Sequence, residues 1–237
     1  MSQASSAPGE QARNPPLWLP TWAVRGPLAS WMRAEAERAG DAYDAPRVLD
    51  VGSGVKPYFP FFEPYASEFV SVDIENPAAD LEGAVEDLPV ADASFDVVIC
   101  NQVLEHCADP AQAVRELRRV VAPGGRVLAS THGVQVYHPA PDDLWRWTHA
   151  GLERLFAQNG DWRSVTVTPS SGTTACVGML ISIYVAQATK RAHAEPLGRA
   201  VISGVNRVAR AIDRRSELLR STRPGTIHAN YHVVAEA

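Results

Sequence analysis

Two carboxylates and a glycine loop follow short apolar runs in the first third of the chain. Asp50 stands near the end of the run RVLDV, and it is followed directly by Gly52, Ser53 and Gly54. A glycine loop can turn sharply and let its backbone approach a ligand closely, because no side chain stands in the way. Asp73 ends the next run, FVSVD. Asp50 can accept hydrogen bonds from a cationic amino group, and Asp73, with Ile74 beside it, can bind both hydroxyls of a ribose.

Two further polar segments fall at positions that suit the same ligand. In the segment EDLP, the Asp87 side chain can accept from an adenine amino group while the backbone of Leu88 reads the ring edge. Asn101 and Gln102 come directly after the apolar run FDVVIC. Each fragment alone is a weak signal. Their order and spacing together predict a site for one nucleoside cofactor.

The apolar runs that carry these groups predict strands of a parallel sheet. Four such runs occur, at 47–51, 69–73, 95–100 and 126–131. Between the last two, apolar residues three or four apart predict an amphipathic helix over 110–122, which Pro123, Gly124 and Gly125 end. Strands joined by helices form a parallel sheet covered on both faces, and ligands bind beyond the carboxyl ends of its strands.

Four ranges describe the organisation that we expect. They are a flexible, Pro-rich tail over 1–20, a cofactor-binding α/β domain over 21–169, a helical insertion or lid over 170–228, and a last strand over 229–237. The domain begins with a helix at 21–39 and has a second one at 148–158, while 162–168 and 230–235 alternate as strands do. The predicted fold is a Rossmann-like, doubly wound, mostly parallel seven-stranded sheet with an antiparallel edge strand.

Composition excludes several classes of protein. The chain has 237 residues, 46% of them hydrophobic and 21% charged, which is ordinary for a globular domain. A net charge of -5 gives no footprint for a polyanion, so we expect no nucleic-acid partner. Cys100, Cys107 and Cys176 lack CxxC spacing, so we predict no disulfide framework, no structural zinc and no other metal site. Residues 1–20 do not resemble a secretory signal, and with three unpaired cysteines we expect a cytoplasmic protein.

The motifs together resemble those of a known family. Over 47–159 the chain is similar to the class I S-adenosylmethionine-dependent methyltransferases, in particular the broad group called type 11, through VLDVGSG, VSVDIEN, EDLPVADASFDVVICNQVLEHCADP and ELRRVVAPGGRVLAST. This resemblance implies that S-adenosyl-L-methionine is the cofactor. It implies that Asp50, Gly52 and Gly54 line its methionine part, Asp73 its ribose, Asp87 and Leu88 its adenine, and Asn101 the floor near the sulfonium.

One departure from the family pattern follows Gly54. The residues there are Val-Lys-Pro-Tyr, where the family has a third glycine, and Pro57, Pro60 and Pro64 interrupt the helix expected next. The competing interpretation of the loop is a dinucleotide site. That site needs glycine or alanine at position 57 to open a helix onto a pyrophosphate, and Pro57 occupies it.

Methyl transfer from a sulfonium requires mainly that the acceptor be held about 3 to 3.5 Å from the methyl carbon. A base is needed only for a weak nucleophile such as a hydroxyl, and histidine is the usual candidate. His132 follows the strand at 126–131 and is the candidate base, the alternative being a polar lining residue. His106, in the turn LEH, is the second candidate, although a structural or cofactor-proximal role suits it better.

The loop before the second predicted helix supplies candidate acceptor-binding residues. Tyr137 and His138 come soon after His132, and Trp145 and Arg146 follow in the motif DDLWRWT. An aromatic wall beside a guanidinium fork would suit a planar or anionic acceptor. The alternative is that Trp145 and its neighbour Trp147 pack beneath the helix while Thr148 caps it.

The insertion contains an apolar stretch and then a basic amphipathic pattern. Residues 175–186 are almost wholly apolar but too few to span a bilayer. From 197 to 220 an apolar stripe alternates with arginines. Such a segment can dock on its own domain as a lid over the acceptor, contact a membrane peripherally through 175–220, or form a homodimer interface.

We therefore predict an S-adenosylmethionine-dependent methyltransferase acting on a small-molecule acceptor, of hydrophobic, glycan or lipid-linked character. The alternative is a non-catalytic protein that keeps the fold and binds the cofactor or a partner. The methyl acceptor, its reacting atom and the choice between monomer and homodimer are not encoded in any motif.

Overall fold

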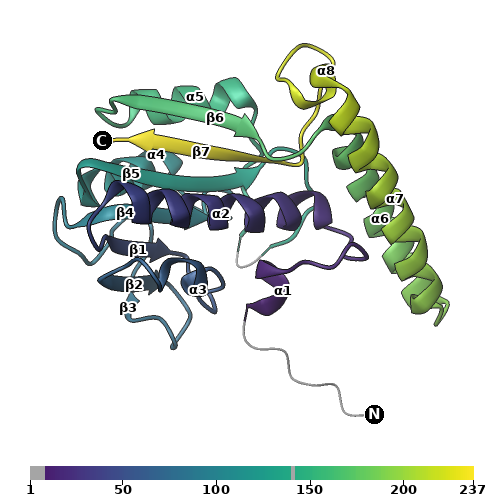
Figure 1. Ribbon diagram of the computed structural model, residues 1–237, viewed down its shortest axis with the longest axis horizontal. Helices are drawn as coiled ribbons and strands as arrows, with labels where there is room; N and C mark the ends of the chain where they lie inside the picture. Colours follow the sequence, from purple (N-terminus) through teal and green to yellow (C-terminus); the bar gives the residue numbers. More distant parts are fainter. Residues whose placement is uncertain (1–8, 140–141) are drawn as a thin grey trace.

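The computed structural model describes residues 9–139 and 142–237. Its centre is one seven-stranded sheet with the strand order β3-β2-β1-β4-β5-β7-β6 (Figure 1). The strands are β1 (Arg47–Val51), β2 (Glu68–Asp73), β3 (Leu81–Glu82), β4 (Phe95–Asn101), β5 (Val121–His132), β6 (Ser164–Pro169) and β7 (Asn230–Glu236). Neighbours are parallel except where β7 pairs with β5 and β6. The antiparallel strand thus lies one place in from the edge, which β6 forms.

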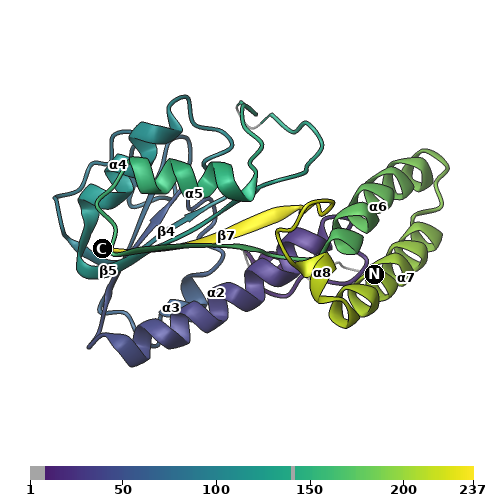
Figure 2. The ribbon, with the colours of Figure 1, turned by 90° about the horizontal axis from the view of Figure 1, so that it is seen from above.

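Helices cover both faces of the sheet, as Figure 2 shows. The helices in the described residues are α1 (Glu10–Arg13), α2 (Trp22–Ala42), α3 (Phe59–Phe62), α4 (Pro110–Val120), α5 (His149–Gln158), α6 (Thr173–Arg191), α7 (Glu195–Arg215) and α8 (Glu217–Arg220). α2 and α3 pack on one face through a core that includes Leu28, Met32 and Phe62. α4 and α5 pack on the other face, where Leu117 and Phe156 are fully buried. The doubly wound α/β fold predicted from the sequence is confirmed.

Local sequence signals set the ends of the two helices on the second face. Asp109 accepts a hydrogen bond from the Gln112 amide at 3.0 Å and begins α4. Thr148 accepts from the Gly151 amide at 3.1 Å and begins α5, as the capping alternative for this residue predicted. Short polar side chains satisfy the amides that a first helical turn leaves free.

Two features of the sheet differ from the prediction. β5 begins at Val121, which pairs with Phe95, instead of at Arg126, because the strand continues through an irregularity at the Pro-Gly-Gly segment, where the register shifts and Gly124 has a φ of 78°. β3 has only two residues, which is too short for periodicity to show. The expectation that prolines shorten the first crossover helix is confirmed, since α3 is a single turn.

The strand register brings the predicted ligand-binding groups to one edge of the sheet. Val51 pairs with Val72 on one side and with Cys100 on the other. Gly52, Asp73 and Asn101 are the residues next to these three, so they lie side by side at the carboxyl ends of β1, β2 and β4. This is the position at which parallel α/β sheets bind ligands.

The insertion is a helical hairpin of α6 and α7 that stands beyond the carboxyl edge of the sheet, on the side of α2 (Figures 1 and 2). Asp213 of α7 accepts hydrogen bonds from the Thr174 and Ala175 amides at 3.0 and 2.9 Å, and so caps α6. Buried residues of α2 and α6, including Val24, Cys176 and Met179, form a third core cluster.

The prediction of a flexible tail over 1–20 does not describe its second half. Asn206 of α7 donates to the carbonyl oxygens of Leu17 and Leu19 at 2.7 and 3.2 Å, and Arg13 donates to the Pro57 carbonyl at 2.8 Å. A polar, Pro-rich composition suggested a tail, but these backbone carbonyls have partners far along the chain. Residues 1–8 lie outside the described residues.

Candidate active site

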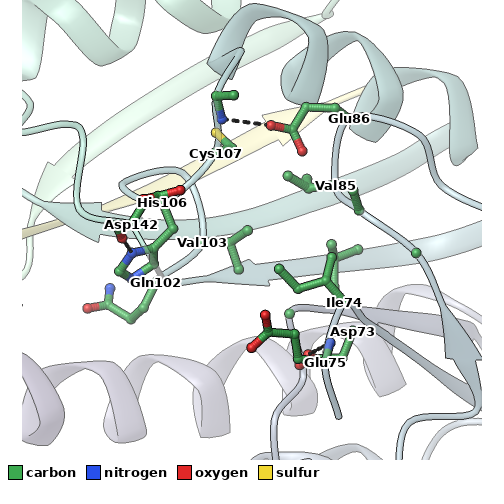
Figure 3. Close-up of a pocket in the computed structure, with 15 residues that line it drawn as sticks. Asp73, Ile74, Glu75, Val85, Glu86, Gln102, Val103, His106, Cys107 and Asp142 are labelled. Atoms are coloured by element: carbon green, nitrogen blue, oxygen red, sulfur yellow. Dashed lines mark hydrogen bonds between the residues drawn. The ribbon is translucent and has the colours of Figure 1, made fainter. Parts of the chain in front are cut away.

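Two adjoining cavities lie at the carboxyl edge and share Gly52 and Gln102. One, of about 320 Å³, is lined by residues of the β2, β3 and β4 ends, among them Asp73, Ile74, Val85 and Glu86. In Figure 3, Ile74 and Glu75 lie on one side of this cavity, and His106 and Asp142 lie on the opposite side. The other, of about 280 Å³, is lined by Asp50, Ser53, Gly54, Tyr58, Asn101 and Arg25 among others. Together they form one elongated cleft.

The glycine loop separates the cavities and is held by Asp73. Gly52 and Gly54 have φ of 65° and 50°, in the left-handed region that favours glycine. A Cβ on Gly52 would lie 2.3 Å from a methyl group of Val103, so a side chain is also excluded sterically. Asp73 accepts from the Gly54 amide at 2.9 Å and from the Glu75 amide at 3.2 Å. The carboxylate expected to bind ribose therefore also fixes the shape of the loop.

Buried polar atoms without partners line the second cavity. Within the described residues, Asp50 Oδ2, Ser53 Oγ and Asn101 Oδ1 are buried and accept or donate no hydrogen bond. An unpaired buried polar atom costs free energy, so a polar ligand at this position would be stabilised. Burial, with a contribution from the Asp73 carboxylate, raises the pKa of Asp50 to about 7. A cationic group bound against Asp50 would favour its ionised form.

The adenine-side prediction was placed slightly too late in the sequence. Asp87 is exposed, and neither it nor Leu88 is among the residues that line the cavity, whereas Ala84, Val85 and Glu86 are. The Leu88 amide, expected to read a ring edge, donates to Glu116 at 2.9 Å. The Glu86 carboxylate accepts from the Ala108 amide at 2.9 Å. Within this segment, the residues that line the cavity come before Asp87, and an adenine-binding role for the segment stays a prediction.

Asn101 and Gln102 lie at the junction of the two cavities. Asn101 Nδ2 lies 3.0 Å from the sulfur of Met32. Gln102 has φ of 59°, and its Nε2 donates to Ser130 and Asn230, both at 3.0 Å. The Gln102 side chain thus anchors the turn after β4 to two neighbouring strands. Their roles as cofactor-binding residues stay predictions.

His106 and His132, the candidate bases, lie in different surroundings. His106 lines the first cavity, and its Nδ1 contacts the Asp142 carbonyl. His132 is 5% exposed, and its Nε2 lies 3.3 Å from Glu105 Oε1. Burial lowers the pKa of His132 to about 3, whereas burial raises the pKa of Glu105 above its ordinary value. His132 is therefore neutral near pH 7 and holds an extra proton poorly.

Arg146, which was predicted to bind an anionic acceptor, is paired within its own loop. Its guanidinium forms hydrogen bonds to both oxygens of Asp143, at 2.5 and 2.7 Å, and donates to carbonyls of Gln135 and Val136. The fork assigned to an anionic acceptor is therefore occupied within the loop, by a carboxylate three residues earlier. The bound guanidinium in turn holds the pKa of Asp143 well below its ordinary value.

The other three predicted acceptor residues lie on or near the surface. Tyr137 is 76% exposed, and Trp145 is 39% exposed with its Nε1 donating to the Cys107 carbonyl at 2.9 Å. Trp145 stacks on Trp147, with ring centroids 5.7 Å apart, and Trp147 packs on the core. The packing interpretation thus describes Trp147, and the acceptor-binding role of Trp145 stays a prediction. His138 contacts both other histidine rings of the site, at centroid distances of 5.4 and 5.1 Å.

Sequence reasoning missed two polar side chains of the second cavity, those of Arg25 and Tyr58. Arg25 comes from the first turns of α2, and Tyr58 from the loop after the glycines. No local pattern marks either residue, because each reaches the cavity through tertiary packing. An arginine near the start of the helix that precedes the glycine loop is the weak signal that was present.

Comparisons with known proteins agree with this geometry. Residues 49–129 match the family described as methyltransferase domain. An uncharacterised methyltransferase YcgJ of Bacillus subtilis is 33% identical over 113 residues, which are 41% of this chain and 42% of that protein. The malonyl-[acyl-carrier protein] O-methyltransferase of Erwinia pyrifoliae is 40% identical over 108 residues, 41% of this chain and 40% of that protein. The chain thus matches about two fifths of the length of these relatives.

A solved structure extends the likeness to most of the fold. A SAM-dependent methyltransferase from Archaeoglobus fulgidus has a TM-score of 0.54 at 14% identity, covering 88% of this chain and 94% of that one. The fold is that of a Rossmann-like α/β protein with a cleft at the carboxyl edge of its sheet. Over residues 49–129 the chain is similar to the class I S-adenosylmethionine-dependent methyltransferases, in the type 11 group.

Proposed function

We propose that this chain transfers the methyl group of S-adenosylmethionine to a small-molecule acceptor. The observation that carries the proposal is the row of buried, unpartnered atoms of Asp50, Ser53 and Asn101 beside the ribose-type carboxylate of Asp73. A zwitterionic amino acid joined to a nucleoside has polar groups that can serve as hydrogen-bond partners for these atoms. An apolar or purely anionic ligand does not.

Each part of the cofactor has residues of matching chemistry. Asp50 suits the ammonium group of the methionine part, and the Arg25 side chain, which lines the same cavity, suits its carboxylate. Asp73 suits the ribose hydroxyls, and Ile74 and Val85 offer apolar surface to adenine. The bound cofactor supplies an electrophilic methyl group on a sulfonium.

The protein then has to position the acceptor and exclude water. Neutral His132, buried behind the cleft, can accept a hydrogen bond from an acceptor hydroxyl but is a weak base. His106 lines the first cavity itself, together with Gln102 and Val103. We therefore propose positioning by these histidines and by His138, with Tyr137 and Trp145 at the outer rim.

The acceptor that we propose is a small molecule carried on, or containing, an apolar group. The relative from Erwinia pyrifoliae is named for methyl transfer to malonyl-[acyl-carrier protein]. Several apolar side chains of the α6–α7 hairpin are exposed, among them Val177, Ile181, Tyr184, Leu197, Val201, Val208 and Ile212. Apolar surface beyond the carboxyl edge suits a hydrophobic or lipid-linked acceptor better than a free sugar. The three cysteines are free and buried, which suits the cytoplasm.

The same hairpin suits peripheral contact with an anionic membrane. Arg207, Arg214 and Arg215 are exposed on α7, the helix that also carries the exposed Leu197, Val201, Val208 and Ile212. No described helix has the length and apolar character that crossing a bilayer requires. Co-sedimentation with anionic and neutral liposomes at low and high salt tests this: anionic-only, salt-sensitive binding is expected, reduced in Val208→Glu. No sedimentation in any condition, or dimerisation on size exclusion, would remove the membrane proposal.

Calorimetry with S-adenosylhomocysteine is the direct test of the cofactor proposal. We expect binding by the wild type, weakened at least tenfold in Arg25→Gln and unchanged in Arg33→Gln, a matched control since both arginines are exposed on α2. Transfer of labelled methyl from the cofactor to a component of cell extract then distinguishes an enzyme from a binding protein. Absence of heat with the wild type would contradict the whole proposal.

A further inference from the structure

A cluster of potential metal ligands lies beside the cleft, outside the cofactor-binding residues. Glu105 follows β4, His132 is the last residue of β5, and His138 lies in the loop after it. Each offers one ligand atom, and these atoms all lie within 4.8 Å of one another. Glu105 is fully buried and His132 nearly so, which separates this cluster from the acidic groups common on protein surfaces.

Glu105 and His132 face each other with an unsatisfied contact. Glu105 Oε2 accepts from the Thr131 hydroxyl at 2.7 Å. Glu105 Oε1 has no hydrogen-bond partner, although His132 Nε2 lies 3.3 Å away, and His132 Nδ1 has none either. Two lone pairs at this distance repel each other unless a cation or a proton lies between them. The contact therefore holds either a metal ion or the proton of the neutral Nε2–H tautomer of His132.

His138 is oriented as a metal ligand would be. Its Nδ1 lies 3.1 Å from the Val136 carbonyl and 3.4 Å from Asp143 Oδ2. The Asp143 side chain is 1% exposed and is itself held by Arg146 at 2.7 Å. A proton on Nδ1 satisfies these acceptors and leaves the lone pair of Nε2 free. Metal-binding histidines typically donate their other ring N–H to a carboxylate or carbonyl in this way.

We propose that Glu105, His132 and His138 bind one divalent transition-metal ion, with Zn²⁺ as the representative ion. Two histidines and one carboxylate form a three-ligand set that Zn²⁺ adopts with a fourth position open. Ligand atoms on a tetrahedral ion with bonds of about 2.0–2.1 Å lie about 3.4 Å apart. The separation of 3.3 Å between Glu105 Oε1 and His132 Nε2 matches that spacing. The ligand atom of His138 lies within 4.8 Å of the other two, so it has to move closer to them when the ion binds.

The site indicates the class of acceptor, a step that rests on the proposed function. His138 contacts His106, and His106 lines the cofactor cavity, so the cluster adjoins the cleft. An acceptor hydroxyl in the open coordination position would lose its proton to solvent water more readily, because the ion would stabilise the alkoxide or phenolate, and that oxygen would then bond to the methyl carbon as the carbon–sulfur bond of the cofactor breaks. The acceptor would then be an oxygen nucleophile, and no strongly basic side chain would be needed.

Calorimetric titration of the chelator-treated full chain with Zn²⁺ tests the site. The wild type should bind one equivalent, and Mg²⁺, which prefers oxygen ligands, should bind far more weakly. Glu105→Gln should lose binding, and His138→Asn should weaken it at least tenfold. His149→Asn is the matched control, because His149 is also half-buried but contacts the Val167 carbonyl instead.

Circular dichroism of each variant keeps the result interpretable. If Glu105→Gln fails to fold, the Zn²⁺ affinity of His138→Asn still tests the site, because His138 is only half-buried. No Zn²⁺ binding by the wild type, or equal affinity in wild type and His138→Asn, would overturn the proposal and leave a shared proton as the occupant of the Glu105–His132 contact. The titration contains neither cofactor nor acceptor, so its failure is distinct from failure to bind S-adenosylhomocysteine.

Discussion

The Asp73 carboxylate on β2 accepts a hydrogen bond at 2.9 Å from the backbone amide of Gly54 in the loop after β1. The residue assigned to the ribose therefore also holds the loop assigned to the methionine part. A change at Asp73 acts on both ends of the cleft.

We expect Asp73→Ala to lower affinity for S-adenosylhomocysteine by more than a hundredfold, about 2.7 kcal/mol. Asp73→Asn, which still accepts one hydrogen bond, should lose less. Calorimetry measures both, with Glu68→Gln as the control on the same strand, since Glu68 forms only an exposed pair with Arg47. Equal affinity in wild type and Asp73→Ala would show that this carboxylate binds no part of the ligand.

The two loop glycines should respond differently to alanine. Both have positive φ, but a Cβ on Gly52 would meet Val103 at 2.3 Å, whereas one on Gly54 meets nothing within 4 Å. Gly54→Ala should therefore cost only backbone strain, about 1 kcal/mol, and Gly52→Ala should cost more. Urea unfolding measures both. Adding Val103→Ala to Gly52→Ala should recover part of the loss, and no recovery would mean that the steric argument is wrong.

Asp50 should make the ligand-free protein less stable as pH rises. Its pKa is about 7 in the folded chain against an ordinary value of 3.8, so between these values the folded state binds more protons than the unfolded state. The free energy of unfolding must then fall with rising pH in this window. Melting temperatures of wild type and Asp50→Asn between pH 4 and 8 should diverge, with the variant the more stable above pH 7. Parallel curves would contradict the burial argument.

The same variant should bind the cofactor less well, although it is more stable. The amide that replaces the Asp50 carboxylate carries no charge to pair with the ammonium group that we assign to this cavity. Affinity of the wild type for S-adenosylhomocysteine should rise as pH increases through about 7, because ionised Asp50 is the binding form. In Asp50→Asn the affinity should be lower at pH 8 and lack this rise. A similar rise in the variant would assign the pH dependence to another group.

Asp213 should be the residue on which the hairpin depends most. It is 4% exposed, and its carboxylate accepts from the first amides of α6. Asp213→Ala should lower the free energy of unfolding by about 1–3 kcal/mol, because it leaves buried amides without an acceptor. Glu217→Gln, an exposed change in α8, is the control. An unchanged urea midpoint in Asp213→Ala would show that the cap contributes nothing.

Sequence alone predicted the parts of the site that depend on local order. Strand ends, the glycine loop and Asp73 follow from patterns within a few residues of each other, and the register of β1, β2 and β4 then brings them together. The error at Asp87 was a small shift along one loop, whose exact path depends on Glu116 holding the Leu88 amide.

Contacts that depend on how the chain folds could not be predicted from local sequence patterns. Arg25 reaches the cleft from α2, and the Arg146 fork is taken by Asp143, a local pair whose geometry depends on the path of the whole loop. The Glu105–His132 contact joins the ends of two strands, and only the β4–β5 register places them together. No spacing within the sequence encodes such a meeting.

The first described residues connect the two ends of the molecule that an acceptor would touch. Arg13 holds the Pro57 carbonyl after the glycine loop, Ala12 lines the cavity of Asp50, and the carbonyls of Leu17 and Leu19 are held by Asn206 on α7. If the hairpin moved on binding a hydrophobic partner, residues 12–19 would have to move with it. The glycine loop and the hairpin are thus joined through a segment that carries none of the motifs shared with methyltransferases.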